Sequence, residues 1–278
     1  MTLSRDAFVD SNTPIEPALT AIFSTSDPLT IFDVGACEGE DTVRYARLFP
    51  EGRVIAVEPL PGNVTRLRDA VTKYGCSGVE IISVALAEHP GRAEFYVSSG
   101  TPPDADRAAD WDYGNKSSSL LRPGLHLEVH PWCRFDEVIT VDVSTLGAVA
   151  AERGIVSIDF LHLDVQGAEL EVLRGAGALL HRISLIWLEV EEVPLYQGQP
   201  VRPEVEAFMG SNGFERLLDT VGAVSGDQLY ASRSRVPEHL RRRAAAAMET
   251  QGAPEFAVHE LSRGPIGRLR RLLRKRRS

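Results

Sequence analysis

The stretch that decides the fold is IFDVGACEGEDT, which runs from Ile31 to Thr42. An apolar run typical of a buried strand ends near Asp33, two glycines follow at Gly35 and Gly39, and an acidic helix start comes directly after them. A strand, a glycine loop and a helix in this order indicate the first unit of a parallel α/β sheet. A dinucleotide site would carry a third glycine, and the carboxylates of this loop would repel a pyrophosphate.

The same loop favours a ligand with a positively charged head. S-adenosylmethionine carries an ammonium and a sulfonium and has no phosphate, so its amino group can meet the acidic loop while its carboxylate takes backbone N–H groups. Glu58 ends the next predicted strand, where it would accept hydrogen bonds from both ribose hydroxyls. A turn-capping Asp33 and a solvated Glu58 are the alternatives. Together, the two strand ends predict a site for a cation-bearing nucleoside.

Strands and helices alternate along most of the chain, which predicts a largely parallel sheet with crossover helices. The predicted strands cover residues 29–34, 53–58, 79–85, 93–98, 137–143, 158–164 and 183–190, with two more around 214–218 and 227–232. The predicted helices cover residues 41–49, 61–74, 144–154 and 203–211, and a short one lies within 166–177.

Three regions are predicted along the chain. Residues 1–24 form a helical lead-in, and residues 25–235 form the main domain, in which the polar segment 98–119 is too long for an ordinary connection and resembles a lid. Residues 236–278 form a helical extension and a basic tail, whose apolar residues fall at helical spacing. Such a tail predicts reversible contact with an anionic membrane surface, with simple disorder or contact with a partner as alternatives.

Composition limits the classes of partner. Residues 263–278 hold eight basic residues, and subtracting these from 30 leaves 22 against 39 acidic residues, a net charge of −17 for the rest of the chain. An acidic body argues against nucleic-acid binding, which depends on a positive surface. No window approaches the roughly 18 apolar residues of a membrane span, and no signal peptide is seen, so a cytoplasmic protein is expected.

A second block, DVQGAELEVLRGA from Asp164 to Ala176, is the most specific part of the sequence. With this block, with FDVGACEG and AVEP at the first two strand ends, and with NKSSSL and LEVEEVPLYQGQP elsewhere, the chain resembles the FkbM-type S-adenosylmethionine-dependent methyltransferases. The resemblance covers about residues 29–232. It implies a Rossmann-like class I methyltransferase fold, in which a seven-stranded, mostly parallel sheet carries helices on both faces.

The resemblance also implies methyl transfer to oxygen, often a hydroxyl on a sugar, a glycolipid or a polyketide-type natural product. An aliphatic hydroxyl is a poor nucleophile near neutral pH, so it needs a base or a metal ion. Asp164 ends the strand expected beside the first strand, and Glu189 ends the next one over. These two carboxylates are a possible Mg²⁺ site; alternatively one of them, or His162, takes the proton. A packed strand histidine is the alternative for His162.

The site predicted from the sequence combines these positions. The catalytic candidates are Asp164, His162 and Glu189, and the cofactor-binding candidates are Asp33, Gly35, Cys37, Gly39, Glu58, Pro59, Ala85 and Ser118. A small-molecule or glycosyl acceptor is the expected partner. Three further groups either reach the site or are structural: the histidines His126 and His130, the polar residues Asn115 and Ser117 to Ser119, and the aromatic residues Trp111, Tyr113 and Trp132. An NAD-dependent oxidoreductase and a non-catalytic scaffold are the rival functions.

Overall fold

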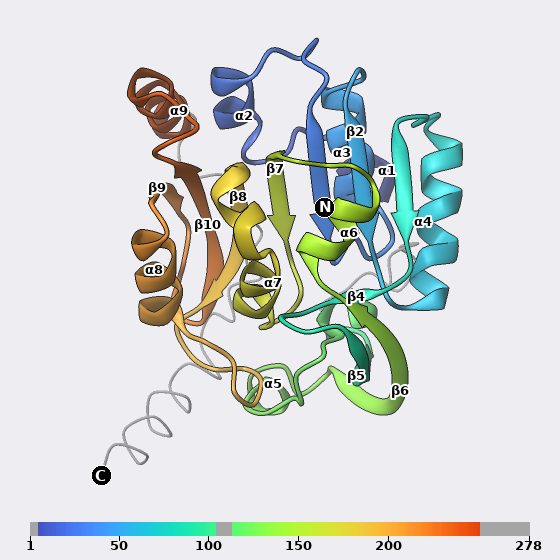
Figure 1. The fold of residues 1–278 in the computed structure, drawn as a ribbon. Coiled ribbons are helices and arrows are strands. Elements are labelled where there is room, and N and C mark those ends of the chain that lie inside the picture. The colour runs from blue at the N-terminus through green and yellow to red at the C-terminus, as the bar shows by residue number, and fades with distance from the viewer. Residues whose placement is uncertain (1–4, 104–112, 251–278) are drawn as a thin grey trace.

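The computed structural model describes residues 5–103 and 113–250. The basic tail and Trp111 lie outside these residues. The centre of the molecule is a seven-stranded sheet of order β3-β2-β1-β7-β8-β10-β9, in which only β10 runs antiparallel to its neighbours (Figure 1). Its strands are β1 (Thr30–Val34), β2 (Arg53–Val57), β3 (Val79–Ile82), β7 (Ile158–Leu163), β8 (Ile183–Glu191), β9 (Phe214–Asp219) and β10 (Ser225–Ser232). The predicted seven-stranded, mostly parallel fold is confirmed.

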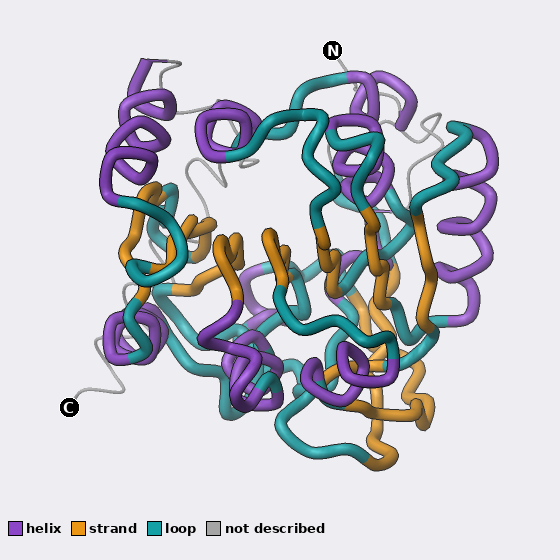
Figure 2. The backbone as a smooth tube through the Cα atoms, turned by 45° about the horizontal axis from the view of Figure 1, so that its top comes forward, coloured by secondary structure: helices purple, strands orange, loops and turns teal. Residues whose placement is uncertain are grey.

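Helices cover both faces of this sheet (Figure 2). They are α1 (Arg5–Asp10), α2 (Glu16–Ile22), α3 (Glu40–Leu48), α4 (Pro61–Lys73), α6 (Leu146–Glu152), α7 (Glu169–Gly175), α8 (Arg202–Ser211) and α9 (Glu238–Thr250). A 3-10 helix, η2 (Gly177–Arg182), leads from α7 into β8. Within the described residues, no helix combines the length and the apolar character needed to cross a membrane.

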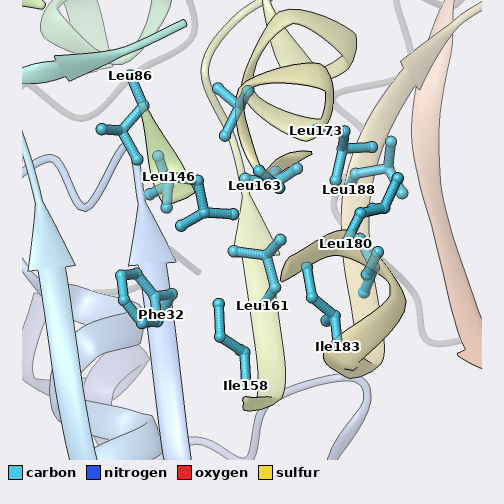
Figure 3. Packing of buried hydrophobic residues seen from close by; sticks show 14 of the residues in the cluster. Phe32, Leu86, Leu146, Ile158, Leu161, Leu163, Leu173, Leu180, Ile183 and Leu188 are labelled. Carbon is cyan, nitrogen blue, oxygen red and sulfur yellow. The ribbon is translucent and has the colours of Figure 1, made fainter. Parts of the chain in front are cut away.

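The alternation of side chains along the central strands builds a core on each face. Phe160 of β7 joins a buried cluster with residues of α2, α3 and α9, whereas Leu161 and Leu163 join a second cluster with α6, α7 and α8. Figure 3 shows this second cluster, with Phe32 and Leu146 beside the leucines of β7. The predicted lead-in and extension therefore pack on the same face of the sheet, and α2 contacts α9.

A smaller sheet lies beyond the carboxyl ends of the main strands (Figure 1). It has the order β4-β6-β5, formed by β4 (Ala85–Leu86), β5 (Gly91–Ser99) and β6 (Arg134–Ser144). The segment between β5 and β6 contains a 3-10 helix, η1 (Tyr113–Ser117), and the short helix α5 (His126–Val129).

Most predicted elements differ from the structure only by shifted ends, but two differ in a way that matters for the site. The predicted strand 79–85 is two strands: β3 pairs with β2 only as far as Ile82, and β4 then pairs with β6 in the smaller sheet. Both pieces are apolar, so the sequence does not show the change of partner. The predicted helix within 166–177 begins only at Glu169, because the chain first turns through Gln166 and Gly167, which both have a positive φ.

Candidate cofactor and active site

A cavity of about 100 Å³ lies at the carboxyl ends of β1, β2 and β7, and β4, β5 and η1 close its far side. Seven of the eight predicted cofactor-binding residues line it: Asp33, Gly35, Cys37, Glu58, Pro59, Ala85 and Ser118. Two predicted catalytic residues, Asp164 and His162, line it as well. The first glycine loop and the DVQGAE block therefore meet in one site.

The glycine loop passes close to the end of β7. Gly35 has a φ of +85°, and a Cβ added there would lie 1.8 Å from the backbone oxygen of Asp164. Gly39, with a φ of +90°, caps α3 and does not line the cavity; a Cβ there would lie 2.3 Å from Leu67 Cδ1. Gly35 thus lets the loop approach Asp164, while Gly39 lets α3 and α4 pack together.

Asp33 is buried at the end of β1 and holds two side chains. Its Oδ1 lies 3.0 Å from His162 Nδ1, and its Oδ2 accepts a hydrogen bond from the hydroxyl of Thr42. Burial alone would lower the pKa of His162, but the hydrogen bond to Asp33 and the charge of that carboxylate outweigh it and raise the pKa to about 9. His162 is therefore an imidazolium at neutral pH, which makes it a poor proton acceptor.

This ion pair gives a pH-dependent component of stability. Because the pKa of His162 is about 9 in the folded state and about 6.5 in the unfolded chain, the stabilisation is complete below pH 6.5 and is lost as the pH rises through 9. Between pH 6 and pH 10 we expect wild type to lose about 3 kcal/mol more of its unfolding free energy than His162→Gln does. Urea denaturation across this range measures the difference. Parallel pH profiles for the two proteins would show that folding does not raise the pKa of His162.

Glu58 lies buried just beyond β2, and each of its oxygens accepts one backbone hydrogen bond. Its Oε2 lies 2.9 Å from the nitrogen of Cys37, and its Oε1 lies 2.8 Å from the nitrogen of Leu60. Burial raises the pKa of Glu58 to about 7 against the lowering effect of these bonds. Cys37 has a φ of +49°, which turns its N–H toward this carboxylate. A carboxylate has further lone pairs, so Glu58 keeps acceptor capacity for two ribose hydroxyls.

The segment around η1 is tied to the first loop by polar contacts. Asn115 donates to Glu38 Oε1 at 2.7 Å and to Asn63 Oδ1 at 3.1 Å. Glu38 is fully buried and pairs with Arg5 of α1, and Lys116 Nζ lies 3.4 Å from Glu40 Oε1. These contacts hold the predicted polar run, Asn115 to Ser119, against the cavity.

Asp164 and Glu189 are bridged by the amide of Gln166. The Nε2 of Gln166 lies 2.7 Å from Asp164 Oδ1 and 2.7 Å from Glu189 Oε2. Its Oε1 lies 3.1 Å from the hydroxyl of Tyr196, and its backbone oxygen accepts from Ser119 at 2.8 Å. Gln166 has a φ of +54°, a strained conformation that is kept only where surrounding contacts fix it. The bridge therefore fixes the two predicted carboxylates relative to each other.

The groups around Asp164 and Glu189 affect the pKa values of these two carboxyl groups differently. Burial, together with the charges of Glu191, Asp164 and Asp227, raises the pKa of Glu189 well above its ordinary value and so favours its protonated form. Burial also raises the pKa of Asp164, but Gln166 and the imidazolium of His162 oppose this shift. Asp164 lines the cavity, whereas Glu189 does not.

The residues present do not fit a Mg²⁺ ion. The amide nitrogen of Gln166 occupies the position between Asp164 and Glu189 that a bridging cation would take. Across residues 5–103 and 113–250, no group of three or more His, Cys, Asp or Glu side chains is arranged to hold a metal. The predicted Mg²⁺ site is not supported.

The two histidines of α5 and its end are structural in this geometry. His126 is buried, and its ring centroid lies 5.2 Å from that of Phe135 and 5.4 Å from that of Tyr196. Burial lowers the pKa of His126 to about 3. His130 stacks against Trp132, with ring centroids 6.0 Å apart, and none of these rings lines the cavity. Of these rings, His126 and Phe135 pack against Tyr196.

Sequence reasoning missed four residues of the site. Gln166, Tyr196 and Lys116 make the contacts given above, and Asp227 of β10 pairs in register with Glu189. Gln166 lies between a strand-end aspartate and a glycine, which is a signal that a turn residue there faces the strand ends. Tyr196, Lys116 and Asp227 lie on segments that no local sequence pattern places near the strand ends.

Comparisons with known proteins agree with this geometry. The family model "Methyltransferase FkbM domain" matches residues 33–216. The 2-O-methyltransferase NoeI of Sinorhizobium fredii is 31% identical over 220 residues, which cover 79% of this chain and 85% of that protein. The 31-O-demethyl-FK506 methyltransferase FkbM of Streptomyces tacrolimicus is 27% identical over 72% of this chain and 78% of its own length.

Among solved structures, the N-terminal domain of EvdMO1 with SAH and D-fucose matches 81% of this chain and 84% of its own, with a TM-score of 0.41 and 14% identity. The family match and the NoeI relative decide between the functions that the sequence leaves open, against the oxidoreductase and the scaffold. The chain belongs to the FkbM methyltransferase family and is an S-adenosylmethionine-dependent methyltransferase.

Proposed function

We propose that this methyltransferase transfers the methyl group of S-adenosylmethionine to a hydroxyl oxygen of a small-molecule or glycosyl acceptor, with Asp164 taking the proton. The observation that carries the proposal is the pair of carboxylates, Asp164 and Glu189, held by Gln166 at adjacent strand ends beside the cofactor cavity. Two relatives are named as O-methyltransferases of a 2-O and a 31-O position, which supports oxygen as the acceptor atom.

The cofactor is proposed to lie across the ends of β1 and β2. Glu58 would bind the ribose hydroxyls, and the acidic first loop at Asp33 and Glu40 would attract the ammonium of the methionine part. Gly35 and Cys37 expose backbone along the same wall. In this arrangement His162 is a positioning residue, because its ring fixes Asp33 rather than touching the acceptor.

Bound in this way, the donor would present its methyl group at the end of β7, and the acceptor oxygen would approach from the side of β8. Transfer is an in-line displacement, so orientation supplies much of the acceleration. The C–S bond breaks, the C–O bond forms, and the hydroxyl proton passes to Asp164. Asp164 suits this role better than Glu189, because Asp164 lines the cavity and Glu189 does not, and because burial and neighbouring carboxylates favour the protonated form of Glu189.

Two further proposals concern the chemical class of the acceptor and contact with a membrane. A polar acceptor with several hydroxyls suits a site beside which Asp164, Glu189 and Asp227 lie, and the charge of Asp164 would repel an anionic acceptor. Contact of residues 263–278 with an anionic membrane is proposed on sequence grounds alone, and vesicle co-sedimentation with and without these residues tests it.

Titration with S-adenosylhomocysteine tests the cofactor site. We expect micromolar binding by calorimetry, unchanged in EDTA, and roughly tenfold weaker binding by Glu58→Gln, because the amide loses one acceptor for a ribose hydroxyl. Glu88→Gln, an exposed residue outside the cavity, is the matched control. Absence of binding by wild type would refute the proposed site.

A screen with radiolabelled S-adenosylmethionine tests the acceptor atom. We expect label to appear in methyl glycosides or polyhydroxylated natural products as a base-stable methyl ether. Release of labelled methanol on mild alkaline treatment would indicate a methyl ester instead, and exclusive labelling of amines would contradict O-methylation.

A further inference from the structure

Lys116 places a positive charge inside the cofactor cavity. Its Nζ lies 3.4 Å from Glu40 Oε1 and 4.0 Å from Cys37 Sγ. Among the described residues that line the cavity, Lys116 is the one lysine or arginine. It reaches the cavity from η1 and lies against the end of the glycine loop, to which both of these contacts are made. The cavity therefore contains the ammonium group of Lys116 at the place where S-adenosylmethionine, which carries an ammonium and a sulfonium, is proposed to bind.

The wall that Lys116 faces is acidic. Asp33, Glu40, Asp41 and Asp164 all line the cavity. Burial would lower the pKa of Lys116, but Cys37, Glu40 and Asp41 raise it above its ordinary value. Lys116 is therefore charged at any physiological pH, and it neutralises part of the acidic wall in the ligand-free protein.

The cavity also has little room beside this side chain. Its volume is about 100 Å³, whereas pockets for small molecules occupy about 300 Å³ or more. Lys116 has the longest flexible side chain of the lining residues, and it is 33% exposed. Cofactor entry accordingly has to displace this side chain or accommodate its charge nearby.

We propose that Lys116 sets the relative affinity of the enzyme for S-adenosylmethionine and S-adenosylhomocysteine, because its ammonium repels the sulfonium of the donor but not the neutral thioether of the product. This inference rests on the cofactor position given under Proposed function. It makes Lys116 a specificity-determining residue, and it makes the enzyme sensitive to accumulation of its product.

The same charge acts on the chemical step. As the methyl group leaves, the sulfur loses its positive charge and the C–S bonding pair stays on it, so the repulsion from Lys116 falls on the way to the transition state. An interaction that disfavours the bound donor more than the transition state raises kcat. Removing the charge is therefore expected to lower both KM for the donor and kcat, the pattern produced when ground-state strain is removed.

Calorimetry with three ligands tests the proposal. For Lys116→Met we expect S-adenosylmethionine to bind on the order of tenfold more tightly, because one like-charge interaction is removed from a partly solvated site. Sinefungin, which carries an amine in place of the sulfonium methyl, should follow S-adenosylmethionine. S-adenosylhomocysteine shares the amino-acid ammonium but lacks the sulfonium charge, so it should tighten less and the ratio of the two affinities should shift toward the donor. Lys116→Arg should restore the wild-type ratio. Arg92→Met, which removes one charge from an exposed site on β5, is the control.

Three results would overturn the proposal. Unchanged affinities would show that Lys116 does not influence the sulfur position, and equal weakening for all three ligands would assign Lys116 to the cofactor carboxylate. Binding of no ligand by the wild type would remove the cofactor site on which the inference depends. This last result separates failure of the proposed site from failure of the role given to Lys116.

Discussion

Asp164→Asn is expected to lower kcat by about 10³-fold, within the range that a positioned general base contributes, while the affinity for S-adenosylhomocysteine changes less than threefold. Asparagine keeps the oxygen that accepts from Gln166 and so preserves the bridge to Glu189, but it cannot take a proton. The measurement is the rate of methyl transfer to the acceptor found in the screen, with calorimetry of the product in parallel.

The pH profile supplies a second readout for this variant. A base must be deprotonated to act, so wild-type kcat should rise with pH through the raised pKa of Asp164, and the Asp164→Asn profile should lack this limb. Asp142→Asn, which removes an exposed carboxylate on β6, should leave rate and profile unchanged. Near-normal turnover by Asp164→Asn would show that another group accepts the proton.

Gly35→Ala is expected to abolish cofactor binding and to lower the unfolding free energy by about 3 kcal/mol or more. The added Cβ would lie 1.8 Å from the backbone oxygen of Asp164, and neither backbone segment can yield as a flexible side chain would. A φ of +85° adds strain for any residue with a Cβ. The glycine loop would therefore have to leave β7, and the cavity between them would lose its shape.

Gly177→Ala separates the two causes of this effect. Gly177 has a φ of +55°, but a Cβ there meets nothing within 4 Å, so only the strain of about 1 kcal/mol applies. Urea denaturation of both variants, with calorimetry of S-adenosylhomocysteine, makes the comparison. If Gly35→Ala were as stable as Gly177→Ala and still bound ligand, close approach of the loop to β7 would not be needed for the site.

The tertiary structure gives different surroundings to acidic residues that share one sequence pattern. Three of these residues, Asp33, Asp164 and Glu189, lie at the ends of apolar strands. Asp33 pairs with the imidazolium of His162, whereas Asp164 lines the cavity. Glu189 lies among other carboxylates. Their roles differ because the neighbouring groups differ at the three positions, and at Asp164 and Glu189 these surroundings raise the pKa. Strand-end position alone does not distinguish them.

What the sequence determined by itself was the fold, the family and the edge of the sheet where the site lies. Asp33, Glu58 and Asp164 could be placed together because parallel strands present their carboxyl ends at one edge, and because the glycine loop after β1 is a local pattern. The DVQGAE block then indicated the family, whose model matches residues 33–216.

Only the tertiary structure decided how these residues act. The contacts from Asp33 to His162, from Gln166 to Glu189 and from Lys116 to Glu40 join residues 129, 23 and 76 positions apart. Such pairs depend on crossover connections and on which strand a segment joins, and the same dependence split the predicted strand 79–85 between two sheets. Periodicity and spacing report local conformation, whereas these contacts are set by the packing of distant segments, which also fixes burial and therefore charge.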